Sequence, residues 1–355
     1  MPESCPPSTR WADVTSGGTT SPGHSRRAVP ALLAGLVLLL AACAGSGRNG
    51  GPAAGSGGDA SLTLYTCVDD DTIQAVLTAF EKAHPRTHVD LFRAPTGQLN
   101  ARVAADARTG GLRADVLWAC DPLTQQAWVD QGLTGGWTPP GAAAIPAQYR
   151  TRDYVGVALL YMVAVTHTGV PAPAAWSDLT GPAYRATAVP DPSVAASALG
   201  SLGWFWAQPG YGIDFYRQLK SGGAVQVSTP DDVTTGVAQG RYKAGITIAN
   251  SAYAAKDAGS PITVTWPEPG AIAIYGPIAL ARHSRHTAAA EQFVGYVVSR
   301  PGQQVLAKAG SYPTRPGVQG PEVPANAPVV EPDWASIAQQ RTTVLADYQR
   351  VFGGG

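Results

Sequence analysis

Short apolar runs rich in β-forming residues alternate with segments of helical spacing in the chain that follows residue 60. The predicted elements are strands at 62–67, 88–93 and 115–120, and helices at 71–82, 98–107 and 123–131. Alternation of this kind joins parallel strands through right-handed crossovers. We therefore predict an α/β fold with parallel-type sheets, in which the first and third strands are neighbours as in the flavodoxin-like strand order.

A second α/β region begins near His167. It contains a helix predicted to start at Asp191-Pro192-Ser193 and to run through Trp206, and an amphipathic helix follows over 334–352. The stretch over 61–352 is long enough to bury one large core or two separate lobes.

Two cysteines of this region stand at the ends of predicted strands. Cys67 ends the first strand and Cys120 ends the third. Neighbouring parallel strands lie roughly 4.8 Å apart, which is close to the Cα separation that a disulfide needs. We predict a Cys67–Cys120 disulfide, and two buried free thiols are the alternative.

The N-terminal segment has the pattern of an export signal. Two arginines precede an apolar run over 31–42 that is too short to cross a bilayer as a permanent helix. The letters LAAC that end at Cys43 resemble the bacterial lipobox, which implies cleavage before Cys43 and attachment of acyl chains such as palmitate to it. We expect a signal peptide over 1–42, a lipidated flexible tether over 43–60, and a protein anchored to the outer face of the cell membrane. An uncleaved signal anchor is the alternative.

Charge and motifs exclude several classes of function. The chain has 25 basic and 25 acidic side chains and no basic stripe interleaved with aromatic residues, so nucleic acid is not an expected partner. A Gly-x-Ser-x-Gly elbow, a phosphate-binding Gly-x-x-x-x-Gly-Lys loop, a His-Glu-x-x-His pair and a Cys-x-x-Cys pair are all missing from the sequence. We expect a binding protein without a cofactor rather than an enzyme.

Five local motifs occur in the order found in extracellular solute-binding family 1. They are Trp176-Ser177-Asp178-Leu179 with Tyr184, Asp191-Pro192-Ser193, Trp266-Pro267-Glu268-Pro269-Gly270, Ala290 to Phe293 with Ser299 to Gln303, and Tyr312-Pro313-Thr314-Arg315. Together with the lipobox and the Gly/Ser-rich tether, these motifs resemble the solute-binding lipoproteins of ABC importers. The resemblance is to the class II periplasmic-binding fold and its ferric-ion and aminoethylphosphonate branch.

The resemblance implies a two-lobed clamp with a hinge of two chain crossings. Lobe one is expected over 61–167 plus 270–352, and lobe two over 168–269. A monomer is expected to capture a small anionic or zwitterionic solute between the lobes and to deliver it to ABC permease subunits. A ferric-ion binder of the same fold, or an exported enzyme or sensor lipoprotein, is the alternative.

Helix N-termini supply the first candidate contacts, because their free N–H groups and partial positive charge suit an anion. One such site is predicted from Ser193 to Ser197, and a second at Thr96 and Gly97. Ordinary capping residues without a ligand are the alternative.

Acidic and aromatic residues supply the other candidates. A carboxylate of the run Asp69-Asp70-Asp71 is expected to hold an ammonium group, with helix capping as the alternative. Tyr253 stands alone near Asn250, where the ferric-ion branch has two tyrosines, so no metal site is expected. Asp121 is expected in the cleft wall with Trp118 and Tyr161, and packing in the core is the alternative for the two aromatic residues. The full set of predicted ligand-binding residues is Asp69, Asp70, Thr96, Gly97, Asp121, Ser193, Ser197, Asn250 and Tyr253.

Overall fold

The computed structural model describes residues 60–353, which belong to the compact unit Ser56–Gly355. The predicted signal peptide, the lipidated Cys43 and the tether up to residue 59 lie outside the described residues. Within the described part of the chain, no helix is at once long and apolar enough to cross a membrane.

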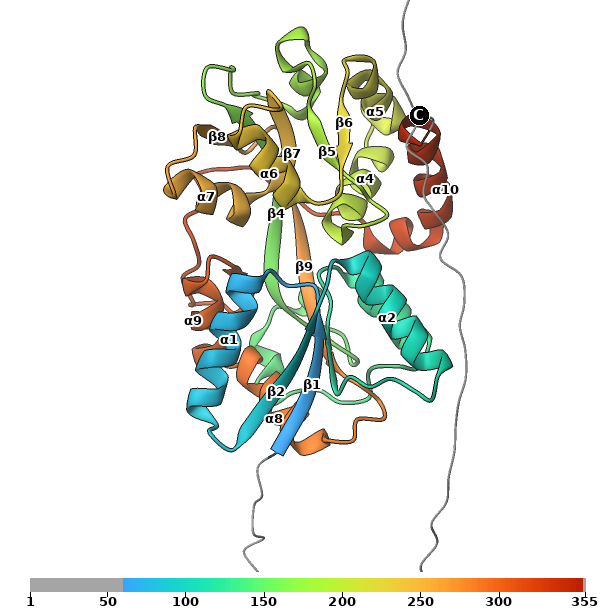
Figure 1. Ribbon diagram of the computed structural model, residues 1–355, viewed down its shortest axis with the longest axis vertical. Helices are drawn as coiled ribbons and strands as arrows, with labels where there is room; N and C mark the ends of the chain where they lie inside the picture. The colour runs from blue at the N-terminus through green and yellow to red at the C-terminus, as the bar shows by residue number, and fades with distance from the viewer. Residues whose placement is uncertain (1–59, 354–355) are drawn as a thin grey trace, which may run out of the picture. The chain divides into compact units, whose positions relative to one another are not determined.

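The first lobe contains three parallel strands in the order β2-β1-β3 and the helices that cover them (Figure 1). Its elements are β1 (Ala60–Thr66), α1 (Asp70–Ala83), β2 (Thr87–Arg93), α2 (Thr96–Arg108), β3 (Val116–Trp118), α3 (Pro122–Asp130), α8 (Thr287–Val298) and α9 (Arg300–Lys308). On α1, the residues spaced for one helix face, Ile73, Val76, Leu77 and Phe80, are buried in the core of this lobe. The predicted alternation and the adjacency of the first and third strands are confirmed.

The second lobe repeats this arrangement with the parallel strands β6-β5-β7. Its elements are β5 (Ala188–Pro190), α4 (Ala196–Ala207), α5 (Gly212–Ser221), β6 (Val225–Val227), α6 (Pro230–Ala238), β7 (Ala244–Ile248), α7 (Ala249–Asp257) and β8 (Ile262–Thr265). Short 3₁₀ turns lie at Ala142–Ala144, Ala147–Tyr149, Trp176–Thr180 and Pro182–Tyr184.

Two long strands run through both lobes and unite them. β4 (Val155–His167) and β9 (Ala271–Leu280) pair with each other in antiparallel fashion. β9 also pairs with β3 of the first lobe, and β4 pairs with β7 of the second. The expected two sheets are therefore one continuous sheet with the path β2-β1-β3-β9-β4-β7-β5-β6. Its two parallel ends are joined by an antiparallel middle (Figure 1).

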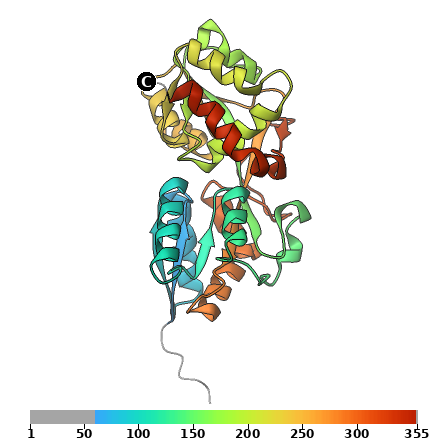
Figure 2. The ribbon, with the colours of Figure 1, turned by 90° about the vertical axis from the view of Figure 1, so that its right-hand side faces the viewer.

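A third segment also crosses between the lobes, whereas two crossings were expected. After α9 the chain forms β10 (Tyr312–Pro313), which pairs with β4, and then β11 (Val329–Val330), which pairs with β9. It continues into α10 (Trp334–Phe352), which packs against α4 and α5 of the second lobe (Figure 2). The hinge therefore consists of three segments.

The position of α10 corrects the expectation that the chain end belongs to lobe one. Val344, Tyr348 and Phe352 form one apolar face of the helix and are buried in the core of the second lobe. The physical reason is that this face needs an apolar partner, and the fully buried face of α4 supplies one. The other boundaries of the two lobes stay a prediction.

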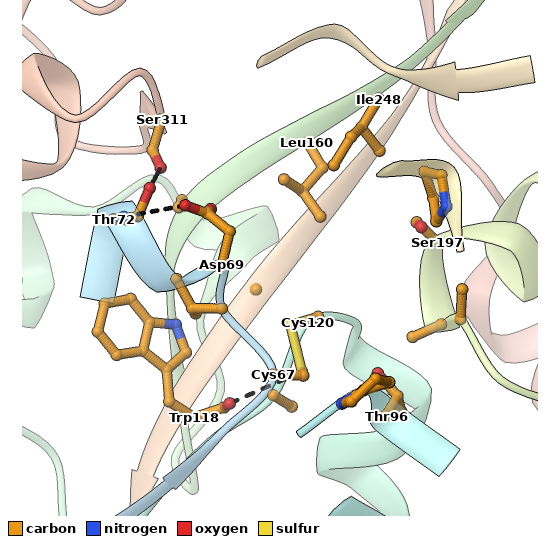
Figure 3. A pocket seen from close by; sticks show the side chains of 18 of the residues that line it. Cys67, Asp69, Thr72, Thr96, Trp118, Cys120, Leu160, Ser197, Ile248 and Ser311 are labelled. Atoms are coloured by element: carbon orange, nitrogen blue, oxygen red, sulfur yellow. Dashed lines mark hydrogen bonds between the residues drawn. A yellow bond between two sulfur atoms is a disulfide. The ribbon is translucent and has the colours of Figure 1, made fainter. Parts of the chain in front are cut away.

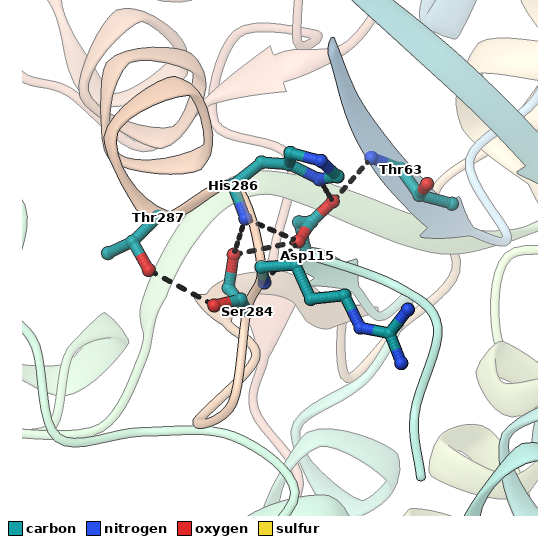
Figure 4. Close-up of polar contacts among 6 residues, drawn as sticks. Thr63, Asp115, Ser284, His286 and Thr287 are labelled. Carbon is teal, nitrogen blue, oxygen red and sulfur yellow. Dashed lines mark hydrogen bonds and ion pairs between the residues drawn. The ribbon is translucent and has the colours of Figure 1, made fainter. Parts of the chain in front are cut away.

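A buried carboxylate fastens β3 to the turn before α8, away from the cleft (Figure 4). Asp115 Oδ1 accepts hydrogen bonds from Ser284 Oγ at 2.7 Å and from the backbone N–H groups of Arg285 and His286 at 3.0 and 3.2 Å. Its Oδ2 accepts from the N–H of Thr63 at 2.9 Å and lies 3.0 Å from His286 Nδ1. Burial raises the pKa of Asp115, but the hydrogen bonds from His286, Thr63 and Ser284 outweigh it, so the pKa is lower than usual.

We expect Asp115→Asn to lower the free energy of unfolding at pH 7 by about 1 kcal/mol, because the amide cannot accept at both positions. A lowered carboxyl pKa adds stability above the unfolded value of about 3.9, and this stability is lost as the pH falls through the lower folded value. The difference between variant and parent should therefore shrink below about pH 4. Urea unfolding at several pH values measures it, and an equal difference at every pH would contradict the expectation.

Candidate functional site: a cleft between the lobes

A cavity of about 110 Å³ lies between the two lobes, at the carboxyl ends of β1 and β3. Four helices begin at its wall, namely α1 and α2 from the first lobe and α4 and α6 from the second. Residues at all four helix starts line it: Asp69, Thr72, Pro95, Thr96, Ala195, Ala196, Ser197, Thr229, Pro230 and Asp231. Each helix start presents the positive end of a helix dipole to the same space.

The four helix starts differ in how their free N–H groups are satisfied. Asp69 caps α1 by accepting from the N–H of Thr72 at 2.9 Å, and Thr229 caps α6. Neither α2, which follows Pro95, nor α4, which follows Ala195, has a side-chain cap. The other first-turn N–H groups of α2 and those of α4 are therefore the ones suited to an anion, whereas the N–H of Gly97 already donates to Val194.

Three of the predicted contact residues meet at this cavity. Asp69, Thr96 and Ser197 line it, and they come from the cap of α1, from α2 and from α4 (Figure 3). Asp70 lies next to Asp69 but is exposed, and its carboxylate is 3.8 Å from Arg93 Nη1.

Gly97 forms a direct contact between the lobes. Its N–H donates to the backbone oxygen of Val194 at 3.1 Å, and a Cβ at Gly97 would lie 3.2 Å from the backbone oxygen of Ser193. This residue therefore joins α2 to the turn before α4, and glycine permits that close approach.

The predicted start of the fourth helix is wrong by several residues. α4 begins at Ala196 rather than at Asp191-Pro192-Ser193. Asp191 Oδ1 instead accepts hydrogen bonds from the backbone N–H and the hydroxyl of Ser193, both at 2.7 Å. This local turn competes with helix formation, and it leaves the Ser193 side chain exposed and outside the cavity.

The remaining candidates lie outside the cavity lining. Asp121 caps α3 and is 1% exposed, and burial raises its pKa. Asn250 and Tyr253 lie on α7, where the Tyr253 hydroxyl accepts from Trp266 Nε1 at 2.9 Å. In the described part of the chain, no group of three or more His, Cys, Asp and Glu residues could hold a metal ion.

Two acidic side chains and one basic side chain line the cavity. Burial raises the pKa of Asp69, and the negative charge of Asp231 from the second lobe raises it further, although hydrogen bonds from Thr72 oppose this. Arg93 also lines the cavity, and its Nε donates to the backbone oxygen of Val68 at 3.0 Å. Two carboxylates that repel each other across a partly dry space favour a positively charged group between them.

Several lining residues were not predicted. Thr72 and Ser311 place their hydroxyl oxygens 3.4 Å apart beside Asp69, and Thr229 and Asp231 begin α6 (Figure 3). A helix is predicted to start at Pro230, and the capping-box signal Thr229-Pro230-Asp231-Asp232 after a strand could have marked its first turn as part of the site. Ser311 had no comparable signal.

The predicted disulfide is confirmed. Cys67 and Cys120 are joined, with their Cα atoms 5.9 Å apart, and both line the cavity. The bridge links the ends of β1 and β3, directly before α1 and α3 begin.

Solved structures share the fold. AfuA from Actinobacillus pleuropneumoniae, with exogenous fructose-6-phosphate bound, has a TM-score of 0.75 at 16% identity, covering 83% of this chain and 99% of its own. Iron-bound HitA from Pseudomonas aeruginosa has a TM-score of 0.70 at 20% identity, covering 81% and 99%. The substrate binding protein of the ABC transporter from Agrobacterium tumefaciens has a TM-score of 0.75 at 15% identity, covering 82% and 95%.

These identities are too low to carry more than the fold, and they confirm the expected two-lobed class. No curated protein sequence matches this chain. The family model described as bacterial extracellular solute-binding protein matches residues 62–311. The chain therefore belongs to the bacterial extracellular solute-binding proteins.

Proposed function

We propose that this protein captures a small anionic or zwitterionic solute in the cavity between its lobes and delivers it to an ABC importer. The observation that carries the proposal is the convergence of two uncapped helix starts, α2 from one lobe and α4 from the other. Their N–H groups, with the hydroxyls of Thr96 and Ser197, form a donor set suited to a phosphate, phosphonate or carboxylate.

A pair of acidic lining residues supports a zwitterion. Asp69 and Asp231 come from different lobes and line the same space, with the hydroxyls of Thr72 and Ser311 near Asp69. An ammonium group between the two carboxylates would reduce their repulsion. It would also donate hydrogen bonds to their oxygens, because it has N–H donors and no acceptor. A solute with both charges would thus contact both lobes.

Because the solute would contact both lobes, its binding would be coupled to a change of conformation. A solute that binds both lobes stabilises the closed arrangement relative to an open one, and the three hinge segments permit rigid-body closure. The closed monomer would then be recognised by permease subunits. The acyl chains on Cys43 would keep it at the membrane surface.

A ferric-ion binder is the second candidate, since one structural relative is iron-bound HitA. Asp69 and Asp231 offer hard oxygen ligands, but Tyr253, the predicted phenolate, lies outside the cavity. The donor set therefore favours an organic anion. An enzyme could have the same cavity geometry but would convert the bound solute. A sensor lipoprotein could also have it but would bind a different partner protein.

Thermal-shift titration with fructose 6-phosphate, aminoethylphosphonate, inorganic phosphate, thiamine and ferric citrate tests the proposal. We expect at least one of the three phosphorus-containing anions to raise the Tm and to reduce the radius of gyration in small-angle scattering. A response to ferric citrate alone would support the iron alternative. A response to none of the three anions would contradict the proposed function, as would chemical turnover of a bound one.

Two neighbouring serines provide a matched pair of variants. Ser197→Ala removes a hydroxyl from the cavity, so the Kd of the responding anion should rise about tenfold through loss of a charge-assisted hydrogen bond. Ser193→Ala removes a hydroxyl three residues before the helix, outside the cavity, and should leave the Kd unchanged. Equal effects of the two variants in calorimetry would argue against anion binding at α4.

A further inference from the structure

The wall of the cavity contains a buried hydrogen-bond donor without a partner. Trp118, the last residue of β3, is 1% exposed, and its indole Nε1 has no hydrogen-bond partner among the described residues. Trp118 lines the cavity, and the nitrogen side of its ring faces the interior of the cavity (Figure 3). Buried polar groups are rarely left unpaired in folded proteins, so this donor requires an explanation.

A glycine lies beside this nitrogen. Gly276 on β9 also lines the cavity, and a Cβ built on it would lie 3.7 Å from Trp118 Nε1 and 3.0 Å from the backbone oxygen of Ala119. Any larger residue at this position would therefore crowd the approach to the indole N–H. The surrounding wall is apolar, with Val68, Leu160 and Ile248 among its members.

The geometry points to Trp118 as a specificity-determining residue whose Nε1–H donates to an oxygen of the bound solute. This inference rests on the proposed function and narrows its substrate class. A solute would carry one anionic group for the helix starts of α2 and α4 and a second oxygen acceptor, such as a hydroxyl, carbonyl or ether, for the indole. An apolar wall cannot replace that acceptor, so solutes that lack it would leave the donor unpaired and bind more weakly.

Trp118→Phe tests the inference because it keeps an aromatic ring and removes only the N–H donor and part of the ring volume. With fructose 6-phosphate as the probe, which carries both an anionic group and further oxygens, we expect the Kd to rise about tenfold in calorimetry. Trp128→Phe, a buried tryptophan of α3 outside the cavity, makes the same chemical change and should leave the Kd unchanged. Inorganic phosphate has no second acceptor group, so its Kd should be the same for the parent and for Trp118→Phe.

Two further measurements separate binding from folding. Trp118→Phe should not lose more stability in the solute-free state than Trp128→Phe, because no hydrogen bond is lost there. In ¹H–¹⁵N spectra, the indole resonance that disappears in Trp118→Phe should shift when fructose 6-phosphate is added to the parent protein. Gly276→Ala narrows the approach to Nε1 and should therefore raise the Kd of fructose 6-phosphate.

The outcomes distinguish this inference from the proposed function. Where the parent binds fructose 6-phosphate with an unshifted indole resonance and Trp118→Phe binds equally well, the inference is overturned and the proposed function stands. Where the parent binds aminoethylphosphonate or phosphate but not fructose 6-phosphate, the second-acceptor class is overturned. Where no anion binds the parent, the proposed function fails and this inference fails with it.

Discussion

Replacing both Cys67 and Cys120 with alanine should lower the free energy of unfolding by about 4 kcal/mol under non-reducing conditions, by the chain-entropy estimate for a long closed loop. The two residues are 53 apart in the sequence, so the bridge removes much freedom from the unfolded chain. Guanidinium unfolding of the parent and the variant measures the difference. The bridge also links two strand ends at the cavity wall, so solute affinity should fall in the same variant.

Reductant supplies the control for this prediction. Dithiothreitol should lower the stability of the parent toward that of the double-alanine variant and should leave the variant unchanged. A double-alanine variant as stable as the parent without reductant would show that the bridge contributes nothing to folding. Single alanine variants are less informative, since each leaves a free thiol able to form mixed disulfides.

The disulfide shows how far local sequence signals reach in this protein. The alternation over 62–131 predicts a parallel sheet, the strand order places the first and third strands together, and the two strand ends then meet. Each step uses a rule about neighbouring elements. The predicted strand order and disulfide agree with the structure because every contact that they require lies within one continuous stretch of chain.

Contacts between distant segments were harder to predict. β4 was not predicted because its residues form an almost unbroken apolar run, which has no period to separate strand from helix. The position of α10 was wrong because an amphipathic pattern shows that a helix needs an apolar partner but not which one. Only the pairing of β11 with β9 reveals the route that takes the chain to α4.

The residues of the candidate site also divide into those that local sequence signals predict and those whose position depends on distant contacts. Asp69 and Thr96 stand at or next to helix starts that the sequence marks locally. Ser197 was predicted from a helix start placed several residues too early, and all three residues line the cavity. Asn250 and Tyr253 were predicted by analogy with the ferric-ion members of the family that the chain resembles, and their place depends on how α7 packs against β4 and β8. Trp118 was expected in the cleft wall and lines the cavity, but nothing in the sequence marks its indole N–H as unpaired, because a buried tryptophan at a strand end is ordinarily part of the core.

The close packing of α4 against α10 leads to the second large expected effect. A Cβ built on Gly203 would lie 2.6 Å from Ile337 Cδ1, whereas a Cβ on Gly295 of α8 meets nothing within 4 Å. Both glycines lie inside helices, where alanine is intrinsically favoured by about 1 kcal/mol. Gly295→Ala should therefore raise the free energy of unfolding by about 1 kcal/mol. Gly203→Ala should lower it by about 2 kcal/mol, because overpacking outweighs propensity.

The comparison of these two variants isolates packing from propensity, since the chemical change is identical. Urea unfolding should separate them by about 3 kcal/mol, which is the cost of overpacking alone because the propensity gain is the same in both variants. Ile337→Ala should destabilise the Gly203→Ala variant less than it destabilises the parent, because it makes room for the new methyl group, and it should destabilise the Gly295→Ala variant as much as the parent. Equal stabilities of the two glycine variants would mean that α10 does not pack closely on α4. The third hinge segment would then end in a helix free to move relative to the second lobe.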